Sequence, residues 1–321
     1  MRAIAVTSLL LVLVLVSLSA YLRLEHSGIG CSPWPSCYGN IGSATAPGGA
    51  ADTYARLLQE ARQPLAWATK AHRLVASVLG LLILSLSLLA LLQKRDRVLS
   101  LALLALTVFL AVLGIRSGGL HDPAVVMGNL GGGFAMLGLL GWLVLREPAG
   151  DGEVRNPLHI AILAALALSC LQILVGGFTS ANFAASACQT LPNCHGSWLP
   201  GSDLLTALDL SRLHQVGDGG FVLGGPERAD IHKLHRLIAS LAFFAILLAA
   251  VMAIRSRHDL RRTSIIVITL VTLEFAVGVG AIVARLPIGL AVAHNWLAAL
   301  LLLGLLRLYA EICRGATPGR A

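Results

Sequence analysis

The sequence predicts an all-α integral membrane protein, with eight transmembrane helices arranged as two repeated four-helix bundles. Composition indicates the membrane class: 56% of the 321 residues are hydrophobic and 12% are charged, whereas a soluble domain carries about 25% charged residues. Three landmarks that recur in order indicate the repeat. The net charge of +8 does not indicate a nucleic-acid partner, because the basic residues stand singly or in short groups and no basic face accumulates.

Eight apolar runs are long enough for helices that cross a bilayer, which takes about 20 residues. The first run also resembles a signal peptide, with a charged start and an apolar stretch. Its removal would leave seven helices and break the repeat, so we expect it to be retained. The runs cover residues 3–22, 69–92, 98–115, 124–145, 158–178, 231–254, 263–284 and 288–310.

Basic residues in the short connections predict the orientation, since positively charged loops stay in the cytoplasm. The connections near residues 94–97, 146–155 and 255–262 together hold nine Lys or Arg, whereas the short turns on the other side hold one each. We therefore expect a multi-pass protein of the inner (plasma) membrane, surrounded by lipid, with both termini cytoplasmic. Two long loops, about 23–68 and 179–230, would face outward.

The three landmarks recur at offsets of 157 to 166 residues. The simplest account is two halves of one topology, residues 1–150 and 151–321, related as parallel repeats. The first landmark is a His-Arg start of the second and sixth helices, at His72-Arg73 and His235-Arg236. The second is a cysteine pair in each outer loop, Cys31/Cys37 and Cys188/Cys194. The third is Leu-Gly-Leu-Leu in the fourth and eighth helices, at residues 137–140 and 303–306.

Histidines lie near the outer ends of three predicted helices. His72 and His235 fall within about one turn of the outer surface, and His294 about two turns in. His235 and His294 therefore share a depth in one half. Ionisable groups inside a membrane are usually functional, and two imidazoles facing each other across a bundle suit the axial positions of a heme iron. The alternative is that each histidine caps a helix or bonds a carbonyl.

The N-terminal half keeps one histidine of this pair. Alignment of the Leu-Gly-Leu-Leu segments puts Gly128 opposite His294, so His72 has lost its partner. His26 and His121, in the outer loops near that level, are candidates for the missing ligand. His232, one turn before His235, is expected to be interfacial, with a supporting role to His235 as the alternative.

The cysteines of each outer loop are separated by five residues. Outside the cytoplasm the environment is oxidising, which favours disulfides between Cys31 and Cys37 and between Cys188 and Cys194. The alternative is thiol exchange, although Cys-x-x-Cys is the usual signature of that chemistry.

Three charged residues complete the candidate site. Glu274 falls near the middle of the seventh helix, where a carboxylate is neutral or paired; it contacts a cofactor edge, relays protons or bonds the nearby backbone. Arg73 and Arg236 each follow a site histidine at the outer boundary. There they pair with heme propionates or snorkel to the interface.

The outer loops resemble those of the heme A synthase family. The segment 21–37 (YLRLEHSGIGCSPWPSC) resembles the first outer loop of that family, and 176–196 resembles the second. The resemblance covers essentially the whole chain. It implies an enzyme that oxidises the C8 methyl of heme O to a formyl group, giving heme A for cytochrome oxidase assembly. It also implies a heme b between His235 and His294, and a substrate heme held by the catalytic His72.

Two positions depart from the family pattern. Thr69 stands where members carry a glutamate, and Gly128 where they carry a second histidine. These departures favour, as an alternative, a catalytically silent homologue that binds or delivers heme. A membrane thiol oxidoreductase using the two cysteine pairs is a third interpretation, which leaves the histidine pair unexplained. In the leading interpretation, the partners of the protein are its substrate heme O, the synthase of heme O as a neighbour, and an electron donor that the sequence does not identify.

Overall fold

The computed structural model describes residues 1–26, 66–116, 123–146, 157–210 and 225–314. This part of the chain contains no β-strand and has eight helices long and apolar enough to cross a membrane, which confirms the predicted class. Cys31, Cys37 and His121 lie outside the described residues. The eight helices are α1 (Arg2–His26), α3 (Ala66–Leu92), α4 (Arg97–Arg116), α5 (Pro123–Leu145), α6 (Pro157–Ala181), α8 (Gly225–Ser256), α9 (Arg261–Val283) and α10 (Ile288–Cys313).

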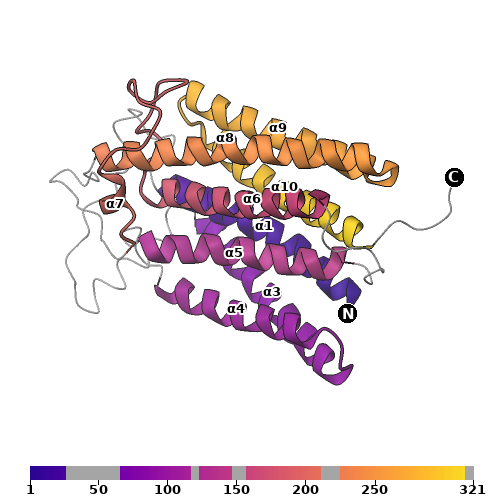
Figure 1. The fold of residues 1–321 in the computed structure, drawn as a ribbon. Coiled ribbons are helices and arrows are strands. Elements are labelled where there is room, and N and C mark those ends of the chain that lie inside the picture. Colours follow the sequence, from indigo (N-terminus) through magenta and orange to yellow (C-terminus); the bar gives the residue numbers. More distant parts are fainter. Residues whose placement is uncertain (27–65, 117–122, 147–156, 211–224, 315–321) are drawn as a thin grey trace, which may run out of the picture.

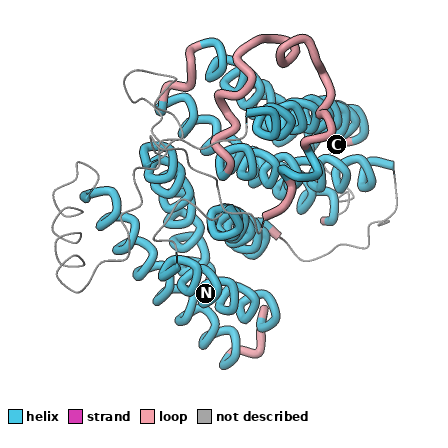
Figure 2. Tube along the Cα trace, turned by 90° about the vertical axis from the view of Figure 1, so that its left-hand side faces the viewer, coloured by secondary structure: helices cyan, strands magenta, loops and turns pink. Residues whose placement is uncertain are grey.

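The long helices run roughly alongside one another (Figure 1). The start of α1 and the end of α10 lie at one end of the bundle. The short helix α7 (Leu204–Ala207) and the loop 182–203 lie at the opposite end. Figure 2 shows this loop crossing the ends of the helices. That end is the one predicted to face outward.

Helix packing divides the eight spans into two rings of four. In the first ring, α1 and α4 each pack against α3 and α5; in the second, α6 and α9 each pack against α8 and α10. The rings meet where α5 packs against α10, α1 against α10, and α5 against α6. Both rings thus use the same pairing, as a repeat requires. The division into two repeated bundles near residue 150 stays a prediction.

Helix α8 begins at Gly225, whereas the sequence predicted a start at residue 231. Its first turns carry Glu227 and Asp230, which are too polar for an apolar span but continue the helix toward the outer loop. Glu227 also complements the positive end of the helix dipole. His235 therefore lies about three turns from the start of the helix, so it does not open the helix as predicted, and its depth below the outer surface stays a prediction.

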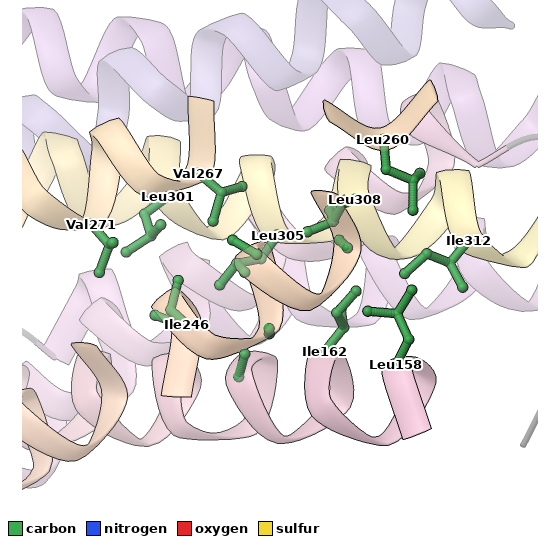
Figure 3. Close-up of a cluster of buried hydrophobic side chains, with 14 of the residues drawn as sticks. Leu158, Ile162, Ile246, Leu260, Val267, Val271, Leu301, Leu305, Leu308 and Ile312 are labelled. Atoms are coloured by element: carbon green, nitrogen blue, oxygen red, sulfur yellow. The ribbon is translucent and has the colours of Figure 1, made fainter. Parts of the chain in front are cut away.

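Aliphatic side chains fill the second ring at the end that holds the start of α1 and the end of α10 (Figure 3). In a membrane, close packing rather than water exclusion holds helices together. Buried polar residues of α6, α9 and α10 (His159, Ser264 and Glu311) lie near this cluster, at the same end of the ring. Side chains in this cluster include Leu158 and Ile162 of α6, Ile246 of α8, Val267 and Val271 of α9, and Leu301, Leu305, Leu308 and Ile312 of α10.

Candidate functional site: a pair of buried histidines

His235 of α8 and His294 of α10 approach each other inside the second ring. Their ring centres are 6.5 Å apart and their ring planes make an angle of 86°. A metal-bound imidazole has its nitrogen about 2 Å from the metal and its ring centre roughly 3 Å away, so two rings on opposite sides of one metal have centres roughly 6 Å apart. The observed separation therefore fits a single iron ion between the two imidazoles.

Helix α9 holds one nitrogen of His294. The Nδ1 atom lies 3.2 Å from the backbone carbonyl oxygen of Glu274 and 3.3 Å from its carboxylate Oε1. Metal-bound histidines usually donate their second N–H to a carboxylate or carbonyl, which fixes the ring. The contacts with Glu274 thus leave Nε2 of His294 for a metal. The other carboxylate oxygen of Glu274 is buried without a hydrogen-bond partner.

Gln172 of α6 has the same relation to His235. Its Nε2 lies 3.1 Å from Nδ1 and 3.5 Å from Nε2 of His235, and its Oε1 is buried without a hydrogen-bond partner. The two ends of an amide have the same shape. A half-turn of the amide lets Oε1 accept the Nδ1–H of His235, which satisfies the oxygen and leaves Nε2 for a metal. Gln172 was not among the residues predicted from the sequence, where a lone amide within an apolar run was the available signal.

Two glycines make room for the imidazoles. A Cβ atom added at Gly176 of α6 would lie 3.2 Å from Cε1 of His235, and one added at Gly278 of α9 would lie 3.0 Å from Cε1 of His294. Both distances are shorter than ordinary contacts between carbon atoms. Each histidine therefore contacts a glycine of a neighbouring helix, which was not predicted from the sequence.

Arg236 attaches the outer loop to α8. Its Nη1 donates to the carbonyl oxygens of Thr190 (2.8 Å) and Asn193 (3.3 Å), and its Nη2 donates to that of Cys188 (2.5 Å). Cys188 and Cys194 form a disulfide with Cα atoms 5.0 Å apart, as predicted. The guanidinium thus holds a disulfide-closed loop directly beside His235. The binding of heme propionates by Arg236 stays a prediction.

The outward extension of α8 anchors the same loop at two more points. Asp230 is buried, accepts a hydrogen bond from Lys233 at 2.9 Å, and accepts others from backbone N–H groups of Gly201 and Asp203. His232 is also buried, with its ring centre 6.3 Å from that of His235, and it bonds the backbone of Ala184. His232 is therefore buried where the outer loop meets α8, and its place at the membrane interface stays a prediction.

The other predicted site residues belong to the first ring. His72 is half-buried on α3 and Arg73 beside it is exposed. Gly128 of α5 faces α4, where an added Cβ would lie 2.7 Å from Cδ1 of Leu113. His26 ends α1, and its side chain is outside the described residues. The structure thus pairs the histidines of one ring and leaves the metal-binding role of His72 a prediction.

The fold and this site define a class of protein: a multi-pass membrane protein with two histidines paired inside one ring of helices. The chain belongs to the COX15-CtaA family of cytochrome oxidase assembly proteins, whose model matches residues 2–306. This membership confirms the family resemblance of the outer loops.

Relatives of known name match most of the chain. It is 34% identical over 307 residues to the heme A synthase of Shewanella oneidensis, which covers 93% of this chain and 92% of that protein. The heme A synthase of Halalkalibacterium halodurans is 25% identical over 313 residues, covering 92% and 91%. A shorter match of 126 residues, 34% identical, is to the protoheme IX farnesyltransferase of Halobacterium salinarum and covers 39% of this chain and 22% of that protein.

Proposed function

We propose that this protein is an oxidoreductase of the heme A synthase type, which converts heme O to heme A by oxidising the C8 methyl to a formyl group for cytochrome oxidase assembly. Membership of the family and near full-length relatives named heme A synthase support this function. The observation that carries the proposal is the pair of imidazoles, 6.5 Å apart between ring centres within a membrane-spanning ring.

The second ring is proposed to hold a heme b through Nε2 of His235 and Nε2 of His294. When bound, a heme with two imidazole ligands supplies one-electron transfer. The protein's own groups fix the ligands. Glu274 accepts the Nδ1–H of His294, and Gln172, once its amide is turned by a half-turn, accepts that of His235; each contact orients the ring and raises its basicity. The loop held by Arg236 covers the outer end of the site and limits the access of water.

The first ring is proposed to receive the substrate heme O, with His72 as its ligand. His72 lies in α3 within a His-Arg sequence, as His235 does in α8. A membrane enzyme that supplies heme O is the expected neighbour, and an electron donor is a further partner that this reaction requires. The orientation with both termini in the cytoplasm belongs to the same proposal.

A second candidate function is that of a catalytically silent homologue that carries heme to the oxidase. Thr69 and Gly128 favour it, because Leu113 of α4 fills the space beside Gly128 where the repeat would place a second ligand. Such a carrier keeps the heme b site of the second ring and leaves heme O unchanged.

The test is to purify the protein from cells that supply heme O and to identify the bound pigments by chromatography and visible spectroscopy. The synthase should contain heme b together with heme A or its hydroxylated intermediate. Heme b should be lost in His235→Ala and in His294→Ala. The control His258→Ala, at the opposite end of the second ring, should keep it. Heme b with unchanged heme O would favour the carrier, and a pigment-free protein would exclude both functions.

A further inference from the structure

The two rings differ at one position, which is His294 in the second ring and the aligned Gly128 in the first. In each ring, this residue and the neighbouring helix share the space between them differently. In the second ring, α10 contributes the large side chain, His294, and the neighbouring α9 contributes Gly278. A Cβ added to Gly278 would lie 3.0 Å from Cε1 of His294. The imidazole thus occupies its position because the facing residue has no side chain.

The first ring has the opposite arrangement. Here α5 contributes Gly128, the position that the repeat aligns with His294, and the neighbouring α4 contributes the large side chains. A Cβ added to Gly128 would lie 2.7 Å from Cδ1 of Leu113 and 3.8 Å from Cζ of Phe109. One turn along α5, a Cβ at Gly132 would lie 2.6 Å from Cδ2 of Leu110.

Small residues four apart let two membrane helices approach closely, and α4 and α5 use Gly128 and Gly132 in this way. The space beside both glycines is therefore occupied, because the ends of the Leu113 and Leu110 side chains of α4 lie there. A histidine at position 128 would require the end of the Leu113 side chain to shift, and a smaller residue at position 113 would remove this contact.

From this exchange of large and small residues, we infer that the first ring binds its substrate heme with a single histidine ligand from the described helices, His72. Leu113 and Phe109 replace a second ligand with an apolar wall. The inference rests on the proposed function, since it concerns the site of the substrate heme. One coordination position of the substrate iron then stays open to a small neutral molecule such as dioxygen, whereas two imidazoles close both positions of heme b. The polarity and access of the unligated side decide which molecules a heme binds.

Carbon monoxide distinguishes the two hemes in the full-length protein, because it binds ferrous heme that has an open coordination position. In protein loaded with heme O, we expect carbon monoxide to bind the substrate heme and to leave heme b unchanged in visible difference spectra. The His72→Ala variant should neither retain heme O nor bind carbon monoxide.

The decisive variant is Leu113→Ala combined with Gly128→His, which exchanges the large and small side chains as in the second ring. It should lose carbon monoxide binding and gain a low-spin spectrum with two nitrogen ligands. Leu113→Ala alone should still bind carbon monoxide. So should Gly138→His, which adds a histidine to the same helix at a position where an added Cβ meets nothing within 4 Å.

Unchanged heme b content in each variant reports an intact fold. Failure of the native protein to bind carbon monoxide while it retains heme O would overturn the inference, because a second ligand, such as His26 or His121, would then occupy the open position. Conversion of heme O to heme A, measured in the same preparations, tests the proposed function separately.

Discussion

Each imidazole of the pair is held by one hydrogen-bonding residue and one glycine. On α9, Glu274 bonds His294 and Gly278 leaves room for its ring. On α6, Gln172 bonds His235 and Gly176 leaves room for its ring. In each helix the two residues are four apart, so they lie on one face about one turn from each other. A single face of α9 and a single face of α6 therefore set the position of the two rings.

Glu274→Gln should raise the midpoint potential of heme b. A carboxylate that accepts the Nδ1–H makes the imidazole a stronger donor and stabilises ferric iron, and a neutral amide does so less. Loss of such a partner typically weakens metal binding by about ten- to a hundredfold. Redox titration followed by visible spectroscopy measures the shift. Glu311→Gln is the matched control, since Glu311 pairs with Arg307 at 2.6 Å near the end of α10; an equal shift in that variant would contradict a specific role of Glu274.

Gly278→Ala should lower the heme b content of the purified protein, because the added methyl group meets the ring of His294 at 3.0 Å. Gly280→Ala, two residues further along α9, meets nothing within 4 Å. It should keep its heme and gain about 0.5–1 kcal/mol of stability, as alanine replaces glycine in a helix. The heme-to-protein ratio and the thermal denaturation of both variants test this pair. Equal heme content in the two would show that His294 has room to move.

At the scale of the element, α8 has two roles along its length. Its inner turns belong to the apolar core, whereas its outer turns extend beyond the predicted span and bind the loop 182–203. Asp230, His232 and Arg236 are the residues that make these contacts. Because His235 lies between them, the loop and the histidine share one rigid support.

Arg236→Ala should loosen the loop that contains the Cys188–Cys194 disulfide. Three carbonyl oxygens lose their donor, and hydrogen bonds to a charged group contribute about 1.5–3 kcal/mol each. The disulfide should then be reduced faster by a mild thiol, as measured by labelling the released cysteines. Arg73→Ala is the control, because Arg73 is exposed on α3. An unchanged reduction rate in Arg236→Ala would show that the disulfide alone fixes the loop.

At the scale of the whole molecule, the two rings are joined along α1, α5, α6 and α10. Polar contacts reinforce this junction: Arg23 of α1 donates to Ser180 of α6 at 3.0 Å, and Asn295 of α10 donates to the carbonyl oxygen of Val16 at 3.5 Å. Because α1 packs against both α5 and α10, the first span is part of the junction between the rings.

The basic connections predict that both termini are cytoplasmic. A fluorescent protein that matures only in the cytoplasm should therefore be bright when fused after residue 321. Alkaline phosphatase, which is active only outside, should be inactive at the same position and active when inserted between residues 199 and 200 of the outer loop. The reverse pattern of activities would contradict the orientation.

The sequence by itself determined the eight spans, the family, the disulfide between Cys188 and Cys194, and the choice of His235 and His294. The spans, the disulfide and the histidine pair follow from apolar length, spacing and repeated motifs along the chain, and the family follows from the resemblance of the outer loops. The predicted repeat also aligned Gly128 with His294.

Only the tertiary structure decided what surrounds those residues. Gln172, Gly176 and Gly278 belong to the site because neighbouring helices face the imidazoles, and Arg236 holds a loop because that loop folds back over α8. Leu113 fills the space beside Gly128 because α4 packs closely against α5. Contacts between helices depend on how their faces are turned toward each other, and hydropathy along one helix does not specify that rotation when almost every face is apolar.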